Sequence, residues 1–176
     1  MKKNTLVLFA LLSILILSCD NNENNNDPII RFEGITEVND GGISTGSTDE
    51  TDWRLDDKWT EQEENIFINI LNNKKTYSLK NSDEIKINPA YPNPCNDFVR
   101  LSFSFTEGTT LKIALVNQNL EVISYVSFDD YLNNTNITYD LSQLNLKNNT
   151  IYRFYYKFEQ SDGSALKGHG DIKISQ

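Results

Sequence analysis

Apolar and polar side chains alternate through the C-terminal half of this chain. Between Val99 and Phe105, apolar residues occupy every second position, and Arg100, Ser102 and Ser104 lie between them. Successive side chains of a β-strand point to opposite faces, so this pattern predicts a strand with one buried face. A helix would instead place its apolar residues three and four positions apart.

Six further segments have strand-like patterns and are bounded by turn residues. They are residues 85–87, 111–115, 122–126, 137–141, 151–159 and 171–175. The turns between them include Asn117–Asn119 and Ser161–Ser164. Seven short strands with recurring turns over residues 85–176 predict an all-β fold, a seven-stranded antiparallel sandwich. Thirteen of the 19 aromatic residues lie between Tyr91 and Phe158, so the core is expected in this region.

The first 18 residues have the pattern of a signal peptide. Lys2 and Lys3 precede an apolar run of 12 residues, from Leu6 to Leu17. A helix needs about 20 apolar residues to cross a bilayer, so this run is too short to span one. Residues 1–18 are therefore predicted to be a signal peptide that is removed from the mature chain.

The residues that end this run, Ile16-Leu17-Ser18-Cys19, resemble the lipobox of bacterial lipoproteins. The resemblance implies that Cys19 carries a lipid and becomes the first residue of the mature chain. Two or more acyl chains hold a protein stably at a membrane. The expected location is the bacterial cell envelope, lipid-anchored at the outer membrane and with surface exposure as an open alternative. The other interpretation is an ordinary signal peptide followed by an incidental cysteine.

Residues 19–50 are rich in Asn, Asp, Gly, Ser and Thr and lack apolar periodicity. Such a segment buries too little apolar surface to offset the entropy of ordering it, so a lipid-anchored, acidic, disordered linker is predicted. Residues 20–64 contain 14 acidic and 3 basic side chains, whereas residues 65–176 contain 11 of each. The net charge of −9 argues against nucleic acid as a partner, because binding it requires clustered Lys and Arg.

A short helix is predicted within residues 51–84, which connect the linker to the sandwich. Thr60 and Glu63 have the spacing of a capping box, in which each side chain accepts a hydrogen bond from the other residue's backbone N–H. The apolar residues Ile66, Phe67, Ile70 and Leu71 then fall on one face of a helix over 61–72. A strand is the alternative, because Ile66, Ile68 and Ile70 also alternate.

The two tryptophans of the chain, Trp53 and Trp59, lie just before this helix. Tryptophan buries a large apolar area, so we interpret both as residues that pack against the neighbouring domain. The alternative is that their rings stack on a ligand such as a sugar.

The segment Asn88-Pro-Ala-Tyr-Pro-Asn-Pro94 precedes the first long strand and contains the tetrapeptide Tyr91, Pro92, Asn93 and Pro94. This start resembles the type IX secretion C-terminal sorting domain of Bacteroidetes-type bacteria. The ordered series continues with a strand at Leu111, the Asp140-Leu141-Ser142 segment, a tyrosine-rich strand from Ile151 and a glycine-containing hairpin into the last strand.

The resemblance implies an immunoglobulin-like sandwich for residues 85–176 and a role in export to the cell surface. Pro92 and Pro94 each lack a backbone N–H and have a fixed φ, so the motif is predicted to run as an extended edge. That edge is either recognised by an export machine or forms a rigid turn that prevents pairing with other chains.

Recognisable catalytic, cofactor and metal motifs are absent from the sequence, which contains no GxGxxG, Walker loop or HExxH pattern. His169 lies between two glycines without a partner at a catalytic spacing, and we interpret it as a surface or turn residue. Cys95 is interpreted as a small core residue. The chain is therefore predicted to be non-enzymatic and to need no cofactor or metal.

Three functional hypotheses follow. The main one is a binding or scaffolding module displayed by a lipid anchor, because the sequence between Cys19 and residue 85 contains no domain-sized cargo. The alternative is that residues 85–176 are a type IX sorting signal. The second alternative is a glycan-binding surface lipoprotein that uses Trp53 and Trp59. The expected partners are the membrane, through the lipid on Cys19, and either export machinery or another envelope protein.

Overall fold

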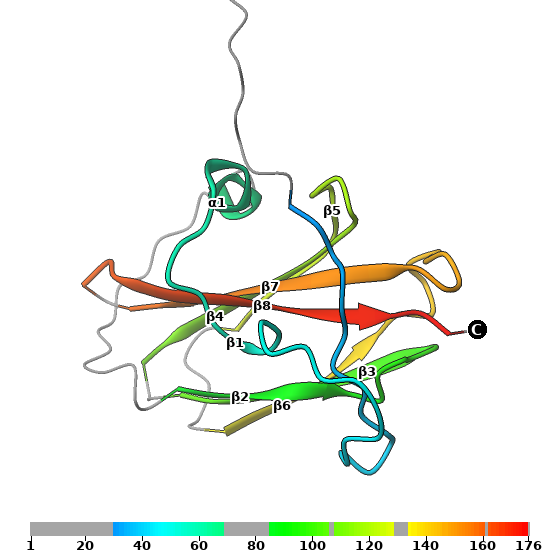
Figure 1. Ribbon diagram of the computed structural model, residues 1–176. Helices are drawn as coiled ribbons and strands as arrows, with labels where there is room; N and C mark the ends of the chain where they lie inside the picture. Colours follow the sequence, from blue (N-terminus) through cyan, green and yellow to red (C-terminus); the bar gives the residue numbers. More distant parts are fainter. Residues whose placement is uncertain (1–29, 69–84, 106–107, 129–133, 161, 176) are drawn as a thin grey trace, which may run out of the picture.

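The computed structural model of the chain describes residues 30–68, 85–105, 108–128, 134–160 and 162–175 (Figure 1). Within these ranges the chain forms eight strands and one helix. In chain order they are β1 Arg54–Leu55, α1 Glu61–Ile68, β2 Lys86–Tyr91, β3 Phe98–Ser104, β4 Thr110–Val116, β5 Val122–Phe128, β6 Asn134–Asp140, β7 Ile151–Glu159 and β8 Ala165–Lys173.

The strands form two sheets that lie face to face, which confirms the predicted all-β sandwich. The larger sheet has the order β1-β8-β7-β4-β5, and the smaller sheet has the order β2-β3-β6. Every strand pair in both sheets is antiparallel. The seven predicted strands correspond to β2–β8, and the structure adds the two-residue strand β1 at the edge beside β8.

The main core lies between the two sheets. From the larger sheet, Phe154, Tyr156 and Phe158 of β7 face inward, and from the smaller sheet Leu101 and Phe103 of β3 meet them. All of these side chains are fully buried, and the alternation that predicted the strands follows from this arrangement.

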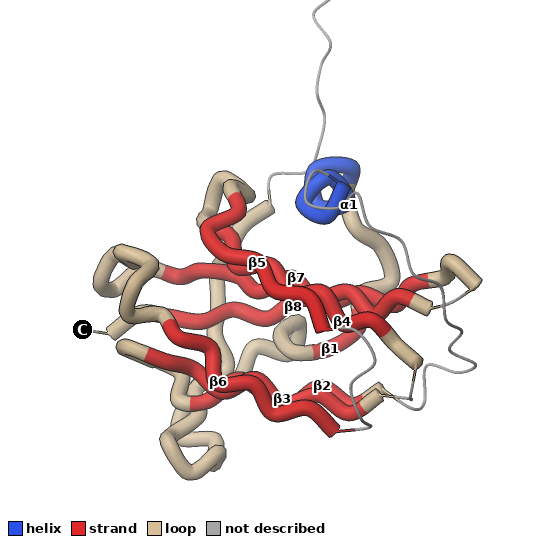
Figure 2. The backbone as a smooth tube through the Cα atoms, turned by 180° about the vertical axis from the view of Figure 1, so that it is seen from behind, coloured by secondary structure: helices blue, strands red, loops and turns tan. Residues whose placement is uncertain are grey.

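A second layer covers the opposite face of the larger sheet. Helix α1 and the segment before it contribute Phe32, Trp59, Ile66 and Phe67, which pack with Tyr155 and residues of β4. Figures 1 and 2 show α1 on one side of the larger sheet and the smaller sheet on the other. Strands β4 and β7 therefore have covered side chains on both faces.

This layer corrects the disordered linker predicted over residues 19–50. Residues 30–50 belong to the folded unit, and Phe32, Ile35 and Val38 are buried in it. Residues 19–29 lie outside the described residues. The prediction was wrong for residues 30–50 because their few apolar side chains are buried against distant strands, which a local pattern does not reveal.

The start of the predicted helix is confirmed. The Thr60 N–H donates to Glu63 Oε2 at 2.7 Å, and the Glu63 N–H donates to Thr60 Oγ1 at 3.3 Å, so the capping box is formed. Helix α1 spans Glu61–Ile68 in the structure. The remainder of the predicted helix and the connecting segment, residues 69–84, lie outside the described residues.

Two glycines of β8 allow β1 and Trp53 to approach the strand closely. A Cβ atom at Gly170 would lie 2.3 Å from the Trp53 ring, and one at Gly168 would lie 2.0 Å from the Arg54 carbonyl oxygen. Glycine within a strand often marks such a close approach. The intervening His169 is therefore not in a turn, as the sequence had suggested, but pairs opposite Tyr155 within the sheet.

Candidate functional site

The Tyr-Pro-Asn-Pro motif lies where β2 ends, and it connects the two sheets to the N-terminal segment, defined here as residues 30–60. The Tyr91–Pro92 and Asn93–Pro94 peptide bonds are both cis. Between the two prolines, Asn93 forms backbone hydrogen bonds in both directions with Val38, each 2.8 Å long. The motif, which was predicted to run as an extended edge, is therefore paired with the N-terminal segment through Asn93.

The Asn93 side chain is 1% exposed and forms three hydrogen bonds to the main chain. Its Nδ2 donates to the Thr36 carbonyl at 3.0 Å and to the Asp171 carbonyl at 2.9 Å. Its Oδ1 accepts from the Lys173 N–H at 3.0 Å. Asparagine has two donors and a carbonyl acceptor, and here one side chain joins the N-terminal segment to strand β8.

Asp52 forms a second connection between the same two elements. Its carboxyl group accepts hydrogen bonds from the Asp171 N–H at 2.9 Å and from the Thr36 N–H at 3.2 Å. Thr36 is thus bonded to both residues: its N–H donates to Asp52, and its carbonyl accepts from Asn93.

A buried ion pair lies behind these connections. Arg153 of β7 donates to Asp171 of β8 through two nitrogens, at 2.6 and 2.7 Å, and both side chains are more than nine-tenths buried. The guanidinium also lies 4.3 Å from the centre of the Phe32 ring. Arg153 therefore stabilises the sheet and one apolar residue of the N-terminal segment together.

Burial is the main cause of the raised pKa values of both acids in this cluster. Burial, together with the nearby Asp171 carboxylate, raises the pKa of Asp52 from 3.8 to about 8. The pKa of Asp171 is also raised by burial, and the hydrogen bonds from Arg153 oppose that increase. At neutral pH, Asp52 therefore holds a proton while Asp171 is paired with Arg153.

Asp52 is expected to make the protein less stable as the pH rises. Its pKa is higher in the folded than in the unfolded chain, so its contribution to stability is complete below about pH 4 and is lost as the pH rises towards 8. The loss is at most about 1.4 kcal/mol per pH unit. Urea unfolding of the full chain and of the Asp52→Asn variant between pH 5 and 7.5 measures it. The stability of the full chain relative to the variant should fall over this range, and a constant difference would contradict the assignment.

Both tryptophans are buried, which corrects the alternative that they stack on a ligand. Trp53 is 4% exposed, and its ring stacks on Tyr156 at a centroid distance of 6.4 Å. Trp59 is 9% exposed and stacks on Phe67 at 5.7 Å. Because protein side chains cover these rings, they offer no open face to a sugar. Their role is packing, the interpretation that the sequence analysis preferred.

Polar contacts complete the layer that contains Trp59. The Tyr155 hydroxyl donates to Glu63 Oε1 at 2.8 Å, which connects β7 to helix α1. Asp56 accepts from the Trp59 indole N–H at 2.7 Å and lies 2.8 Å from His169 Nδ1. The partly buried His169 thus has a structural partner in Asp56.

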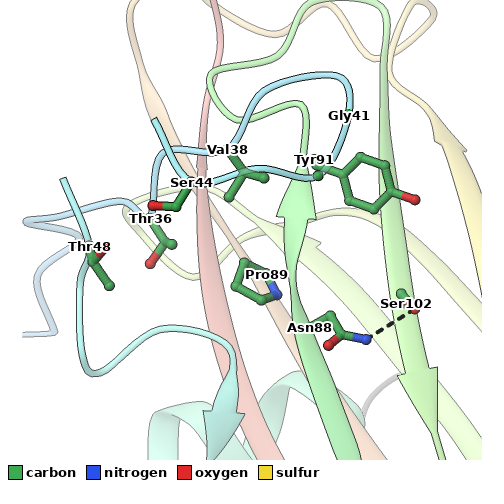
Figure 3. A pocket seen from close by; sticks show the side chains of 10 residues that line it. Thr36, Val38, Gly41, Ser44, Thr48, Asn88, Pro89, Tyr91 and Ser102 are labelled. Carbon is green, nitrogen blue, oxygen red and sulfur yellow. Dashed lines mark hydrogen bonds between the residues drawn. The ribbon is translucent and has the colours of Figure 1, made fainter. Parts of the chain in front are cut away.

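A groove opens beside the motif, between residues 36–48 and the strands β2 and β3. Its volume is about 460 Å³. Figure 3 shows Thr36, Ser44 and Thr48 on one side, and on the other Asn88 and Tyr91 from β2 and Ser102 from β3. The remaining lining residues are Val38, Gly41, Gly42 and Pro89. We call this surface the motif groove.

In the described part of the chain, no three His, Cys, Asp or Glu side chains are grouped as metal ligands would be. Cys95 is buried, and burial raises the pKa of its thiol to about 12, so at neutral pH it is a protonated core residue. Among the described residues, no helix is long and apolar enough to cross a membrane. The signal peptide over residues 1–18 and the lipidation site Cys19 lie outside the described residues.

The motif could be predicted from the sequence, but its neighbours could not. The role of Asn93 in joining β8 to the N-terminal segment was not foreseen, and neither was the cluster of Asp52, Arg153 and Asp171. No local pattern marks these contacts, because the partners of the Asn93 side chain are 57 to 80 residues away in sequence. One signal was available. Gly168 and Gly170 lie two residues apart just before the predicted last strand, and paired glycines at such a place indicate close approach of another segment.

The comparisons with known proteins identify the region around this site. Residues 89–152 match the model of a family described as a secretion system C-terminal sorting domain. The match begins beside Asn88 in the motif groove and includes the whole tetrapeptide, which confirms the resemblance drawn from the sequence. No curated protein matches the chain.

Proposed function

We propose, from the premise that residues 89–152 belong to the family of secretion system C-terminal sorting domains, that the sandwich directs this chain through the type IX export machinery to the cell surface. The family match at the Tyr-Pro-Asn-Pro motif is the observation that carries the proposal. It favours the sorting role, first considered as an alternative, over the binding or scaffolding role considered as the main hypothesis.

The packing around the motif supports recognition of a folded domain. Asn93 and Val38 are buried and joined by hydrogen bonds, so an export component would meet the motif as part of a formed surface. Of the motif residues, Tyr91 and Pro92 are partly exposed and Pro94 is exposed. These three side chains, and not Asn93, are the ones that a partner contacts in this proposal.

The proposal also includes a lipid anchor and the lack of enzymatic activity. The lipid on Cys19 holds the exported protein in the outer membrane of a Bacteroidetes-type bacterium. The sandwich itself has no enzymatic activity. The lipobox resemblance of residues 16–19 supports the anchor. The absence of a catalytic motif from the sequence supports a non-enzymatic role.

Surface exposure of the full chain in two strains tests the sorting role. The chain is expressed in a Bacteroidetes-type host with working type IX machinery and in a derivative that lacks it, and intact cells are treated with proteinase K. The protein should be degraded in the first strain and protected in the second, with a periplasmic protein as the control for cell integrity. Equal degradation in both strains would contradict the proposal.

A Cys19→Ser variant separates the anchor from the sorting role. In the working strain the variant should still leave the cell, but it should be recovered in the medium and not in the membrane fraction. A variant that remains with the membrane although residues 1–18 have been removed, as its intact mass shows, would contradict the lipid anchor and would not affect the strain comparison.

A further inference from the structure

We infer that the motif groove is a binding site for a neutral saccharide. The inference rests on the chemistry and geometry of the groove, independently of the sorting role and of the buried tryptophans. A volume of about 460 Å³ is within the range of ordinary small-ligand sites.

The lining of the groove is uncharged and includes several polar groups. Three hydroxyl side chains, one amide and one phenol line it, from Ser44, Thr48, Ser102, Asn88 and Tyr91. Each of these groups can donate or accept a hydrogen bond, as the hydroxyls of a sugar require. The Thr36 hydroxyl also lies at the groove, but it is already bonded to the main chain of Asp49. The apolar part comes from Val38, Pro89 and the ring of Tyr91, which can pack on the C–H face of a pyranose.

Several of these groups are available to a ligand. Ser44 and Thr48 are exposed, and the described residues provide no hydrogen-bond partner for their hydroxyls or for that of Tyr91. The Asn88 Nδ2 donates to Ser102 Oγ at 3.3 Å, which positions the amide and leaves its oxygen open. Figure 3 shows this pair on the strand side of the groove, opposite Ser44 and Thr48.

The same lining argues against charged ligands. Neither an acidic nor a basic side chain is among the residues that form the groove. A phosphate, a sulfate or a uronic acid would enter a site without a cation to pair with it, whereas a neutral sugar needs none.

An extended peptide is also disfavoured. A peptide adds to a sheet through a row of backbone N–H and C=O groups on the edge strand. Pro89 has no N–H, and the pairing of β2 with β3 is irregular between Asn88 and Tyr91. The edge beside the groove therefore lacks the regular ladder that strand addition needs.

Nuclear magnetic resonance of the purified full chain tests the site. The probes are maltohexaose, cellohexaose, galactan and yeast mannan, with heparin as the charged control. At least one neutral saccharide should shift the Asn88 side-chain amide signal with saturation, while the Asn136 amide signal stays in place. Asn136 is exposed and lies opposite Ser102 on β6, outside the groove.

Matched variants locate the binding. Asn88→Ala should weaken the saccharide's affinity by about tenfold, the effect of losing one well-formed hydrogen bond, and Asn136→Ala should leave it unchanged. Equal weakening by both variants would overturn the inference, as would no saturable shift with any neutral saccharide. Equal binding of heparin, or displacement of the saccharide by the neutral peptide acetyl-(Ser-Val)₃-amide, would also overturn it. Because these measurements need no export, their failure leaves the sorting role untouched.

Discussion

Replacing Asn93 with alanine is expected to lower the free energy of unfolding by about 3 kcal/mol. The change removes three hydrogen bonds and leaves two carbonyls and one N–H of the main chain without this partner in a buried place. Each buried group that loses its partner costs about 1 kcal/mol or more. Urea unfolding followed by circular dichroism measures the loss.

Asn96 provides the matched control for this change. It lies three residues further along the same segment, and its side chain is exposed. Asn96→Ala is expected to change the free energy of unfolding by less than about 0.5 kcal/mol. A loss of similar size in the two variants would show that Asn93 has no special role in joining β8 to the N-terminal segment.

Replacing Arg153 with methionine is expected to have the second large effect, a loss of about 3–5 kcal/mol. Methionine retains much of the apolar stem but leaves the buried Asp171 carboxylate without its two charged hydrogen bonds. It also removes the guanidinium from the Phe32 ring, so the N-terminal segment loses a contact as well. Urea unfolding at pH 7 measures the loss.

The effect of Arg153→Met should depend on pH. Burial already raises the pKa of Asp171, and removing the cation raises it further, so protonation at low pH relieves part of the cost. The loss should therefore be smaller at pH 5 than at pH 8. Lys157→Met, in the same strand, removes a partly exposed cation that lies 3.3 Å from Glu159, and it should cost less than about 1 kcal/mol. Equal losses at Arg153 and Lys157 would contradict the structure.

The strands could be predicted because their buried and exposed side chains alternate, and this alternation is visible in the sequence. Val99, Leu101 and Phe103 are fully buried and alternate with partly exposed residues, as a strand with one covered face requires. The prediction was less accurate for β8, which begins at Ala165 and not at residue 171. Its glycines interrupt the apolar pattern, because they lie where Trp53 and β1 approach.

The N-terminal segment could not be predicted for a physical reason. Few of its residues are apolar, and local composition correctly indicates that such a chain would not fold alone. Its order comes from partners supplied by the sandwich, through Asn93, Asp171 and Tyr155. Sequence pattern detects burial along an element, but it does not detect hydrogen bonds between elements that are more than 50 residues apart.

The candidate site could be predicted from the sequence only in part. The tetrapeptide was found through its resemblance to a family, and the family match agrees with it. The motif groove was not foreseen, because one of its sides comes from residues 36–48, which were expected to be disordered. No sequence pattern marks Ser44 or Thr48. Their place in the lining of the groove is seen only in the folded chain, where this segment lies against β2.

Native-state hydrogen exchange tests most directly whether the sorting motif and the N-terminal segment form one folded unit. The Val38 N–H donates to the Asn93 carbonyl, and the Lys173 N–H of β8 donates to the Asn93 side chain. These two amides should exchange with the same opening free energy, close to that of global unfolding, while the amide of the exposed Gly46 exchanges much faster. Rapid exchange of Val38 at the rate of Gly46, with Lys173 still protected, would contradict the account.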